Sequence, residues 1–462
     1  MTKRDKTRAG EVLAKKTKLY VVLILCLIIV GYILLAVLPY VGRVRVPDAT
    51  RELFSMENFF GQCTQPERVM LVEYPRDAFF HRVNLISNAT EEILLSSFVI
   101  DDGESTDIIV GALLAAADRG VHVRILNNAV VGQMPRRYLH ALSAHENINV
   151  YLFNQFNLLE PQFINAALHC KYLIADSTFM LLGGRNMSDR YFGLDGFTGN
   201  VSFDREVLVY NTDPDFSGSI NEVMAYFNAK INSNKTSLVA RGSDAAQSEF
   251  IHQYQNFSDT LETFDYYSNT MGVNRITLIT NGFETARKES IVAYNLMQLA
   301  LNSSAVIAQS PYVALTSRNL ELFAEVTTGR DFTLLTNSLA STPNLPAFSA
   351  YHVSRGRLVD AGITIYEFQS MDSNIHGKTY LFDGRLTAIG SFNLNERSIR
   401  SDTESMLIID SEEFHEITLS AINNLRAQSI RVGEEEITTA SFGKRLLYTI
   451  AGYVLYPFRF LF

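Results

Sequence analysis

The stretch HCKYLIADSTFMLLGGRN, residues 169–186, is repeated with few changes as HGKTYLFDGRLTAIGSFN, residues 376–393. The two copies align without a gap. Each keeps a histidine, a lysine two residues later, an aspartate, a pair of small residues and an asparagine. The matched positions are His169 and His376, Lys171 and Lys378, Asp176 and Asp383, Gly183 and Gly390, Gly184 and Ser391, and Asn186 and Asn393. Such a repeat predicts two similar lobes that each contribute half of one site.

Both copies are apolar and β-branched enough to favour strands. In a strand, residues i and i+2 project from the same face, so we expect His169 beside Lys171 and His376 beside Lys378. An imidazole next to an ammonium makes a poor hydrophobic face but a good site for a phosphate. Lysine and asparagine can hold the phosphate oxygens, while an imidazole attacks phosphorus or protonates the leaving oxygen.

Two lobes docked face to face would bring both histidines to one phosphate from opposite sides, as in-line displacement requires. One histidine then forms a phosphohistidine and the other transfers the proton. The two lysines and two asparagines would balance the charge of the transition state, so we predict a site without a metal or cofactor. Asp176 and Asp383 are predicted to hold the turns that follow, and the small residues after them to allow close backbone approach.

A carboxylate is expected behind each histidine, because a hydrogen bond to Nδ1–H would leave Nε2 as the reactive nitrogen. Glu206 opens the apolar segment EVLVY and Glu404 opens ESMLII, each shortly after one copy of the motif. These two residues are the predicted partners, with Asp204 as the alternative to Glu206.

The rest of the chain also repeats as alternating elements. Residues 91–126 and 303–337 both read as strand, helix and strand, and a second helix and a further strand follow each unit before the histidine motif. This alternation predicts an α/β fold in which each lobe is a mainly parallel sheet flanked by helices. We place the lobes at residues 65–211 and 273–430, with a connecting helical region at 212–272.

The composition argues against nucleic-acid-binding, disulfide-rich and zinc-binding proteins. The chain has 462 residues, 47% hydrophobic and 19% charged, and a net charge of −9. The negative charge argues against a nucleic-acid partner, since phosphate-binding surfaces need clustered lysine and arginine. Cys26, Cys63 and Cys170 are too few for a disulfide framework or a zinc cluster.

Both termini are expected to contact a membrane. Residues 19–42 contain no charged side chain and follow a basic segment, 1–18. They are predicted to form a transmembrane helix with the basic segment in the cytoplasm, the alternative being a cleaved signal peptide. The C-terminal segment, 442–462, combines Lys444, Arg445 and Arg459 with many Leu, Tyr and Phe residues. It is predicted to lie in the membrane interface, the alternative being a helix packed on the core.

The doubled H-x-K-x4-D-x6-G-[GS]-x-N pattern resembles the catalytic signature of the phospholipase D superfamily. Within it, GALLAAADRGVHVRIL, LLGGRNMSDRYFG and LLTNSLASTPNLPAFSAY look like segments of the bacterial cardiolipin synthases of the C type. The resemblance covers about residues 65–430. It implies that His169, Lys171, Asn186, His376, Lys378 and Asn393 are catalytic, with His169 the nucleophile and His376 the acid and base.

The expected activity is therefore transfer of a phosphatidyl group between phospholipids such as phosphatidylglycerol or phosphatidylethanolamine. The product would be cardiolipin or a relative, and the catalytic body would lie on the periplasmic side of a bacterial inner membrane. Two alternatives remain at this stage. One is hydrolysis to phosphatidic acid by the same site, and the other is a nuclease of the same superfamily, which the charge and the anchor disfavour.

Overall fold

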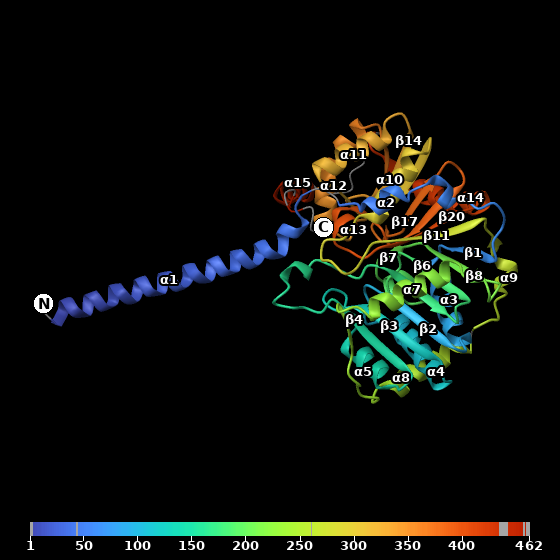
Figure 1. The fold of residues 1–462 in the computed structure, drawn as a ribbon, viewed down its shortest axis with the longest axis horizontal. Helices are drawn as coiled ribbons and strands as arrows, with labels where there is room; N and C mark the ends of the chain where they lie inside the picture. The colour runs from blue at the N-terminus through green and yellow to red at the C-terminus, as the bar shows by residue number, and fades with distance from the viewer. Residues whose placement is uncertain (1–2, 43–44, 260, 434–441, 456–457, 459–462) are drawn as a thin grey trace.

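In the computed structural model, two lobes face each other and a long N-terminal helix projects away from them (Figure 1). The structure describes residues 3–42, 45–259, 261–433, 442–455 and 458. The helices that precede the second lobe in the sequence are α1 (Lys3–Val37), η1 (Leu38–Tyr40), α2 (Asp48–Glu52), η2 (Met56–Phe59), α3 (Pro75–Asn88), α4 (Glu104–Asp118), α5 (Arg136–Ala144), η3 (Pro161–Phe163), α6 (Asp189–Phe192), α7 (Ser219–Ile231), α8 (Gln247–Ser258) and α9 (Tyr266–Asn269). Those that follow are α10 (Ile291–Leu301), α11 (Ser317–Thr327), α12 (Leu345–Asp360), α13 (Glu396–Arg400), α14 (Glu412–Arg426) and α15 (Phe442–Leu455).

Each lobe is built on one large sheet. The first has the order β10 (Met271–Gly272), β1 (Glu67–Val72), β8 (Glu206–Asn211), β6 (Phe179–Gly183), β5 (Lys171–Ala175), β2 (Glu92–Ser97), β3 (His122–Asn128), β4 (Ile148–Phe153) and β9 (Thr236–Leu238). The second has the order β11 (Arg275–Thr280), β20 (Ser405–Asp410), β18 (Leu386–Gly390), β17 (Lys378–Phe382), β12 (Ala305–Gln309), β14 (Asp331–Asn337), β15 (Thr364–Phe368) and β21 (Ser429–Arg431). From β1 and β11 onward the two orders correspond strand for strand, which confirms the predicted pair of similar lobes.

The expectation of mainly parallel sheets is wrong, because both sheets are mixed. Within the two large sheets, the parallel pairs are β2–β3 and β3–β4 in the first and β12–β14 and β14–β15 in the second. The motif strands β5 and β17 instead pair antiparallel with β6 and β18, the strands that follow them directly. Only a few residues join each pair, and so short a connection permits only an antiparallel hairpin.

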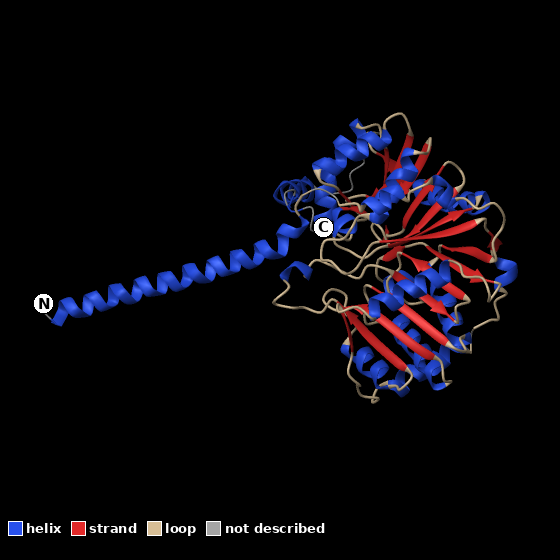
Figure 2. Cartoon of the chain, in the orientation of Figure 1, coloured by secondary structure: helices blue, strands red, loops and turns tan. Residues whose placement is uncertain are grey.

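The two sheets share a central layer of apolar side chains. Leu182 and Val207 of the first sheet belong to the same buried cluster as Ile389 and Leu407 of the second. Helices α7 and α14 lie in this layer, whereas α3 and α4 pack on the other face of the first sheet and α10 and α12 on the other face of the second. Figure 2 shows helices on both sides of the sheets. Because the lobes share a core, the relative position of their motif strands is set by packing.

Short strands also cross between the lobes. β7 (Val201–Phe203) of the first pairs in parallel with β16 (Ser373–Ile375) of the second, immediately before the second histidine motif. A further short pair, β13 (Val313–Ala314) with β19 (Leu394–Asn395), lies within the second lobe just after that motif. Both pairs fix the backbone on either side of the second motif.

The segment between the lobes, residues 212–272, packs against the first of them. Helix α8 lies along α4, α7 contributes Ile220 and Phe227 to the central layer, and β9 pairs with the edge strand β4. The segment therefore covers the first sheet as well as leading to the second lobe.

The terminal segments carry exposed apolar surface. Residues Lys15–Tyr40 form one apolar helical stretch of 26 residues, long enough to cross a membrane. At the other end, α15 packs on α12, where the ring of Tyr448 meets Phe348 at 5.8 Å, but it exposes Leu447, Ile450 and Tyr453. Residues 1–2 of the basic segment and 456–457 and 459–462 of the C-terminal segment lie outside the described residues.

Candidate active site

Both motif histidines lie where the lobes meet, and the backbone of each is bonded to the opposite lobe. The amide of His169 donates to the carbonyl oxygen of Thr403 at 3.2 Å, and the amide of His376 donates to that of Phe203 at 2.6 Å. Both side chains are buried. The lobe contact therefore brings together two residues that are far apart in the sequence, as the repeat predicts.

Each imidazole is oriented by a carboxylate of the other lobe. The Nδ1 atom of His169 lies 3.0 Å from Oε2 of Glu404, and the Nδ1 atom of His376 lies 2.5 Å from Oδ2 of Asp204. In both cases the bond at Nδ1 leaves Nε2 to face a substrate. The structure thus places Glu404 at the predicted position and uses the alternative, Asp204, in the other half.

The predicted contact between Glu206 and a histidine is absent from the structure. Its carboxylate is instead buried between two arginines, 2.8 Å from Nη1 of Arg82 and 3.1 Å from Nε of Arg185. A buried carboxylate held by two guanidinium groups has its charge satisfied there. Glu206 therefore ties β8 to α3 and to the segment after β6, and Asp204 is the residue at His376.

The sequence held a signal for this arrangement. Asp204-Arg-Glu206 and Asp402-Thr-Glu404 are the same D-x-E pattern at equivalent places in the two lobes. In the first lobe the aspartate reaches the histidine, and in the second the glutamate does so, while Asp402 pairs with Arg397 at 3.0 Å. Reading the pattern as a unit would have given both carboxylates as candidates in each lobe.

The small residues of the motif explain part of this asymmetry. A Cβ atom added to Gly184 would lie 2.4 Å from Oδ1 of Asp204, so only glycine leaves room for that carboxylate. The equivalent position in the second lobe is Ser391, whose hydroxyl donates to Glu404. Gly183 and Gly390 allow close strand approach, because an added Cβ would meet a neighbouring carbonyl oxygen at 2.3 and 2.1 Å.

Asp176 and Asp383 lie away from the histidines, at the turns that end the motif strands. Asp176 accepts from the amides of Glu91 and Glu92 at 2.8 and 3.0 Å, and Asp383 accepts from those of Ser304 and Ala305 at 2.8 and 2.9 Å. Both adopt positive φ, 54° and 47°. They join the turn to the start of the neighbouring strand, β2 or β12, which is a structural role.

The motif lysines are buried beside the histidines. Lys171 Nζ donates to the carbonyl oxygen of His169 at 2.5 Å, and Lys378 Nζ lies 2.9 Å from Nδ1 of His376. Burial lowers the pKa of Lys171 to about 8, against the attraction of Glu404, and lowers the pKa of Lys378 to about 7, against that of Asp204. A bound phosphate would favour the charged form of both.

The histidine and carboxylate pKa values differ between the two halves. Burial and Lys171 hold the pKa of His169 well below its usual value, and burial and Lys378 lower the pKa of His376 to about 3, so both are neutral at rest. Burial raises the pKa of Glu404 to about 7. Burial acts the same way on Asp204, but Lys378 and His376 outweigh it and hold the pKa of that carboxyl below its usual range. Asp204 is therefore the more fully ionised partner.

The motif asparagines differ in their contacts. Asn186 accepts from the amide of Val99 at 3.2 Å and donates to the hydroxyl of Tyr191 at 3.3 Å. Asn393 is buried, and its side-chain oxygen has no hydrogen-bond partner among the described residues. An unsatisfied buried amide next to a phosphate-binding motif is a candidate ligand group for the substrate.

Aromatic side chains that the motif analysis missed line the two histidines. The hydroxyl of Tyr191 is 3.4 Å from Nε2 of His376, and the ring of Tyr312 lies 6.0 Å from that imidazole. On the other side, the ring of Phe98 lies 5.2 Å from both the His169 ring and Lys171 Nζ. All three rings come from outside the repeated segments, and only Tyr191 follows the first of them closely.

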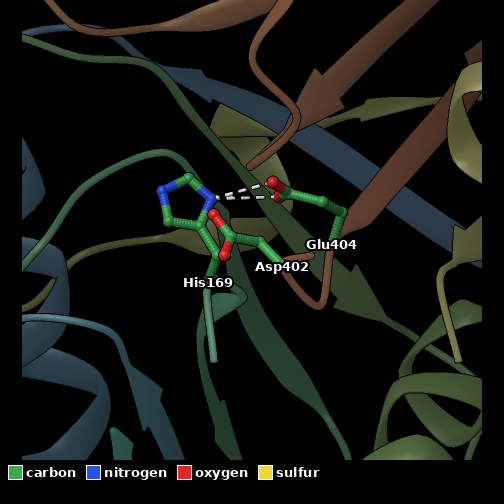
Figure 3. Close-up of side chains that lie close together, drawn as sticks. All are labelled: His169, Asp402 and Glu404. Atoms are coloured by element: carbon green, nitrogen blue, oxygen red, sulfur yellow. Dashed lines mark hydrogen bonds and ion pairs between the residues drawn. The ribbon is translucent and has the colours of Figure 1, made fainter. Parts of the chain in front are cut away.

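The carboxylates around His169 form a group whose composition resembles a metal site. Figure 3 shows Asp402 and Glu404 beside the imidazole, with dashed lines from Nδ1 to Glu404 only, and the ligand atoms of the three residues lie within 4.8 Å of one another. Each acid already has a protein partner, since Glu404 accepts from His169 and Ser391, and Asp402 is paired with Arg397. A metal ion would have to displace these bonds.

Chelation is therefore expected to leave turnover unchanged. If the lysines and asparagines have the predicted role, they supply the charge stabilisation that a metal would otherwise provide. The measurement is the rate of phosphodiester cleavage after dialysis against EDTA, with and without added Mg²⁺, Ca²⁺ or Zn²⁺. A loss of activity that one of these ions restores would contradict the model of the site.

A second prediction concerns alkaline pH. Because Lys378 and Lys171 have lowered pKa values of about 7 and 8, the free site loses positive charge as the pH rises through this range. The kcat/KM for an anionic phosphodiester is expected to fall as the pH rises through about 7 to 8. In Lys378→Arg the guanidinium stays charged, so its alkaline limb should lie at higher pH whatever its absolute rate. Identical profiles for the two proteins would exclude Lys378 as the group responsible.

Two lobes of this topology, with a histidine and a lysine from each at their contact, define an enzyme of the phospholipase D superfamily. A model of the family described as cardiolipin synthase, PLD-like domain, matches residues 83–230 and 298–426, which include both motifs. The chain belongs to this family, and it is a phospholipid-handling enzyme of the cardiolipin synthase-like kind.

Individual proteins agree with this assignment. Cardiolipin synthase C of Escherichia coli is 26% identical over 399 residues, which cover 76% of this chain and 82% of that protein. An uncharacterized protein of Helicobacter pylori is 26% identical over 399 residues, covering 75% and 76%. The crystal structure of phosphatidylserine synthase from Haemophilus influenzae has a TM-score of 0.62 at 12% identity, covering 91% of this chain and 97% of that one. This last likeness is one of fold.

Proposed function

We propose that this chain is a membrane-anchored phosphatidyltransferase that makes cardiolipin or a closely related phospholipid. The observation that carries the proposal is the pair of buried histidines, one from each lobe, each oriented through Nδ1 by a carboxylate of the opposite lobe. The similarity to cardiolipin synthase C of Escherichia coli supports the choice of phospholipids as substrates. Phosphatidylglycerol or phosphatidylethanolamine would act as donor.

In the first half-reaction, Nε2 of His169 attacks the phosphorus of the donor. The new P–N bond forms as the bond from phosphorus to the head-group oxygen breaks. That oxygen takes a proton from Nε2 of His376, which has been protonated in the complex with the anionic phosphate. Lys171 and Lys378 balance the charge on the non-bridging oxygens.

In the second half-reaction, the hydroxyl group of the acceptor lipid replaces the departed alcohol. His376, now neutral, removes the hydroxyl proton, the acceptor oxygen attacks phosphorus, and the P–N bond breaks to release His169. The overall transfer is balanced, since the proton given to the leaving group is recovered from the acceptor. Water in place of the lipid hydroxyl gives phosphatidic acid, so hydrolysis is the alternative function of the same site.

The unequal carboxylates support this division of roles. The proton-carrying histidine must become an imidazolium, which a fully ionised neighbour stabilises best. Asp204 has the lowered pKa and contacts His376, whereas Glu404, with a pKa raised to about 7, contacts His169. The pairing favours His376 as acid and base and His169 as nucleophile.

Product analysis tests the proposed function. The purified chain is incubated with phosphatidylglycerol alone and with phosphatidylglycerol plus phosphatidylethanolamine, and the products are identified by mass spectrometry. Cardiolipin as the main product, with release of glycerol or ethanolamine, is the expected result. Phosphatidic acid as the main product under both conditions would favour the hydrolytic alternative and overturn the transferase proposal.

The proposed topology places the N-terminal basic segment in the cytoplasm, the apolar helix across a bacterial inner membrane and the catalytic lobes on the periplasmic side. The helix Lys15–Tyr40 supports an anchor by its length and composition. A reporter that is active only in the cytoplasm, fused after residue 432, should be inactive. A signal from the intact fusion would contradict this orientation.

The loop between β4 and the first motif supports entry of lipid from the bilayer. It exposes Phe156, Leu158 and Leu159, the last at 90%, and it approaches the end of the apolar helix, where the hydroxyl of Tyr40 donates to the carbonyl oxygen of Gln162. The loop leads directly to His169. Apolar side chains at this position would enter the membrane interface beside the catalytic site.

Replacing Leu158 and Leu159 together by serine is therefore expected to slow turnover of vesicle-borne lipid about tenfold or more, since several buried CH₂ groups per side chain are lost. Hydrolysis of a short-chain soluble phosphodiester should be unchanged. The matched control is Leu238→Ser, another exposed leucine. Equal losses on both substrates would show that the loop acts through the fold and not through the membrane.

A further inference from the structure

The second lobe contains an apolar cavity of about 570 Å³ that is separate from the two histidines. It lies between one face of the second sheet and helices α10, α11 and α13. Leu296 and Ala300 of α10, Phe323 of α11, and Phe332 and Tyr380 of the sheet are among its walls. A volume of this size is within the range of natural ligand sites.

The wall of the cavity includes residues next to the second histidine motif. Phe392 and Leu394, the neighbours of Asn393, are both part of its wall. The ring of Tyr380 lies in the wall, and its hydroxyl donates to the carbonyl oxygen of Phe392 at 3.2 Å. The backbone segment 392–394 therefore carries both the motif asparagine and two residues of the cavity wall.

Two arginines supply most of the charge at the cavity. Arg51 of α2 and Arg318 of α11 belong to its lining, and both are exposed. Neither forms an ion pair with any residue in the described part of the chain. An apolar interior with two exposed guanidinium groups matches a ligand that has a long hydrocarbon chain and an anionic phosphate.

The cavity also lies close to the end of the apolar helix. The carbonyl oxygen of Gly42 accepts from Nη1 of Arg400 at 2.6 Å, and the amide of Ser290 donates to the carbonyl oxygen of Arg45 at 2.8 Å. Val46, the next residue, is part of the wall. Val46 is six positions after Tyr40, a span of at most about 20 Å, so a membrane crossed by this helix would have its surface near the cavity.

From these observations we propose that the cavity is an accessory phospholipid site. One acyl chain of a lipid in the adjoining leaflet occupies the apolar interior, and the phosphate of its head group binds Arg51 and Arg318. The inference rests on the proposed membrane anchoring, but not on the proposed reaction. The bound lipid is distinct from the substrate, because neither motif histidine is part of the cavity wall.

The absence of tryptophan from the sequence gives a direct test. A single tryptophan is introduced as Phe323→Trp in the cavity wall, or as Tyr267→Trp on α9 as the exposed control. Both are made in a His169→Ala background, so that no lipid is turned over. Detergent-solubilised full-length protein is titrated with phosphatidylglycerol brominated on one acyl chain, and tryptophan fluorescence is recorded.

Saturable quenching of the cavity tryptophan, with little quenching of the control, is expected. Arg51→Glu combined with Arg318→Glu should raise the apparent Kd about tenfold or more, since two charge-assisted contacts become repulsive. Ala300→Phe, which fills the cavity, should abolish saturable quenching. Correct folding of Ala300→Phe is checked in a separate protein that retains His169, by its rate of hydrolysis of a soluble phosphodiester.

Three results would overturn the accessory site. They are equal, non-saturable quenching of both reporters, quenching that survives the two arginine replacements, and saturable quenching by a brominated free fatty acid but not by the phospholipid. None of them depends on which product the enzyme makes. Failure of the transferase proposal would therefore leave this test intact, and failure of this test would leave the reaction unaffected.

Discussion

Replacing either His169 or His376 by alanine is expected to lower turnover by on the order of 10³-fold or more while the fold is retained. In the proposed mechanism each imidazole performs a phosphoryl or proton transfer, and both side chains are buried where the lobes meet. The rate is measured on defined phospholipids and on a soluble phosphodiester, so that membrane binding does not enter the comparison. His252→Ala, at an exposed histidine outside the site, is the matched control.

The two histidine variants should differ in what they accumulate. If His169 is the nucleophile, His376→Asn still forms the P–N bond with a donor whose leaving group needs no proton, such as a p-nitrophenyl ester. A stoichiometric burst and an acid-labile phosphorylated peptide that contains residue 169 are then expected. His169→Asn should give neither. The reverse pattern would make His376 the nucleophile and His169 the acid and base. More than a few per cent of residual turnover of phospholipid in either variant would contradict the two-histidine mechanism.

Most of the site was predictable from the sequence because the repeat carries it. Two gapless copies of one motif imply two similar halves, and the alternation of strand residues places His169 beside Lys171 and His376 beside Lys378. The structure agrees on both points. The α/β class and the pair of lobes also followed from local patterns, since each lobe opens with a clear strand, helix and strand.

The direction of the strands was harder to predict, because alternating helices and strands indicate parallel pairing only while a helix separates consecutive strands. The motif strands break this rule. Asp176 and Asp383 adopt positive φ in tight turns, which return the chain antiparallel as β6 and β18. The sequences ADSTF and FDGRL contain the turn residues, and their short length is the signal for hairpins.

The exchange of carboxylates between the lobes could not be predicted from the spacing. Asp204 lies just before β8, which begins at Glu206, so the alternation of strand residues does not decide which carboxylate meets His376. Arg82 and Arg185 hold Glu206, and the space beside Gly184 admits Asp204. These are contacts between distant segments, which only the assembled structure supplies.

Removing the charge of Asp204 should therefore affect catalysis, whereas removing that of Glu206 should affect stability. Asp204→Asn is expected to lower kcat by about 10²- to 10⁴-fold, because the amide can hold the wrong tautomer of His376 and cannot stabilise its imidazolium. Glu206→Gln should instead leave Arg82 and Arg185 buried without a counter-charge. That change is expected to lower the free energy of unfolding by about 3–5 kcal/mol. Urea denaturation and single-turnover rates on the soluble phosphodiester measure the two effects separately.

The comparison depends on kcat per folded molecule, because a destabilised protein also loses total activity. Once the unfolded fraction is corrected for, Glu206→Gln should retain most of its kcat, whereas Asp204→Asn should be slow at near-normal stability. Asp402→Asn, the equivalent change at the acid paired with Arg397, is the control in the second lobe and should resemble Glu206→Gln in leaving the chemical step largely intact. If Glu206→Gln, and not Asp204→Asn, removed the chemical step, the assignment of Asp204 as the partner of His376 would be wrong and the original expectation for Glu206 would stand.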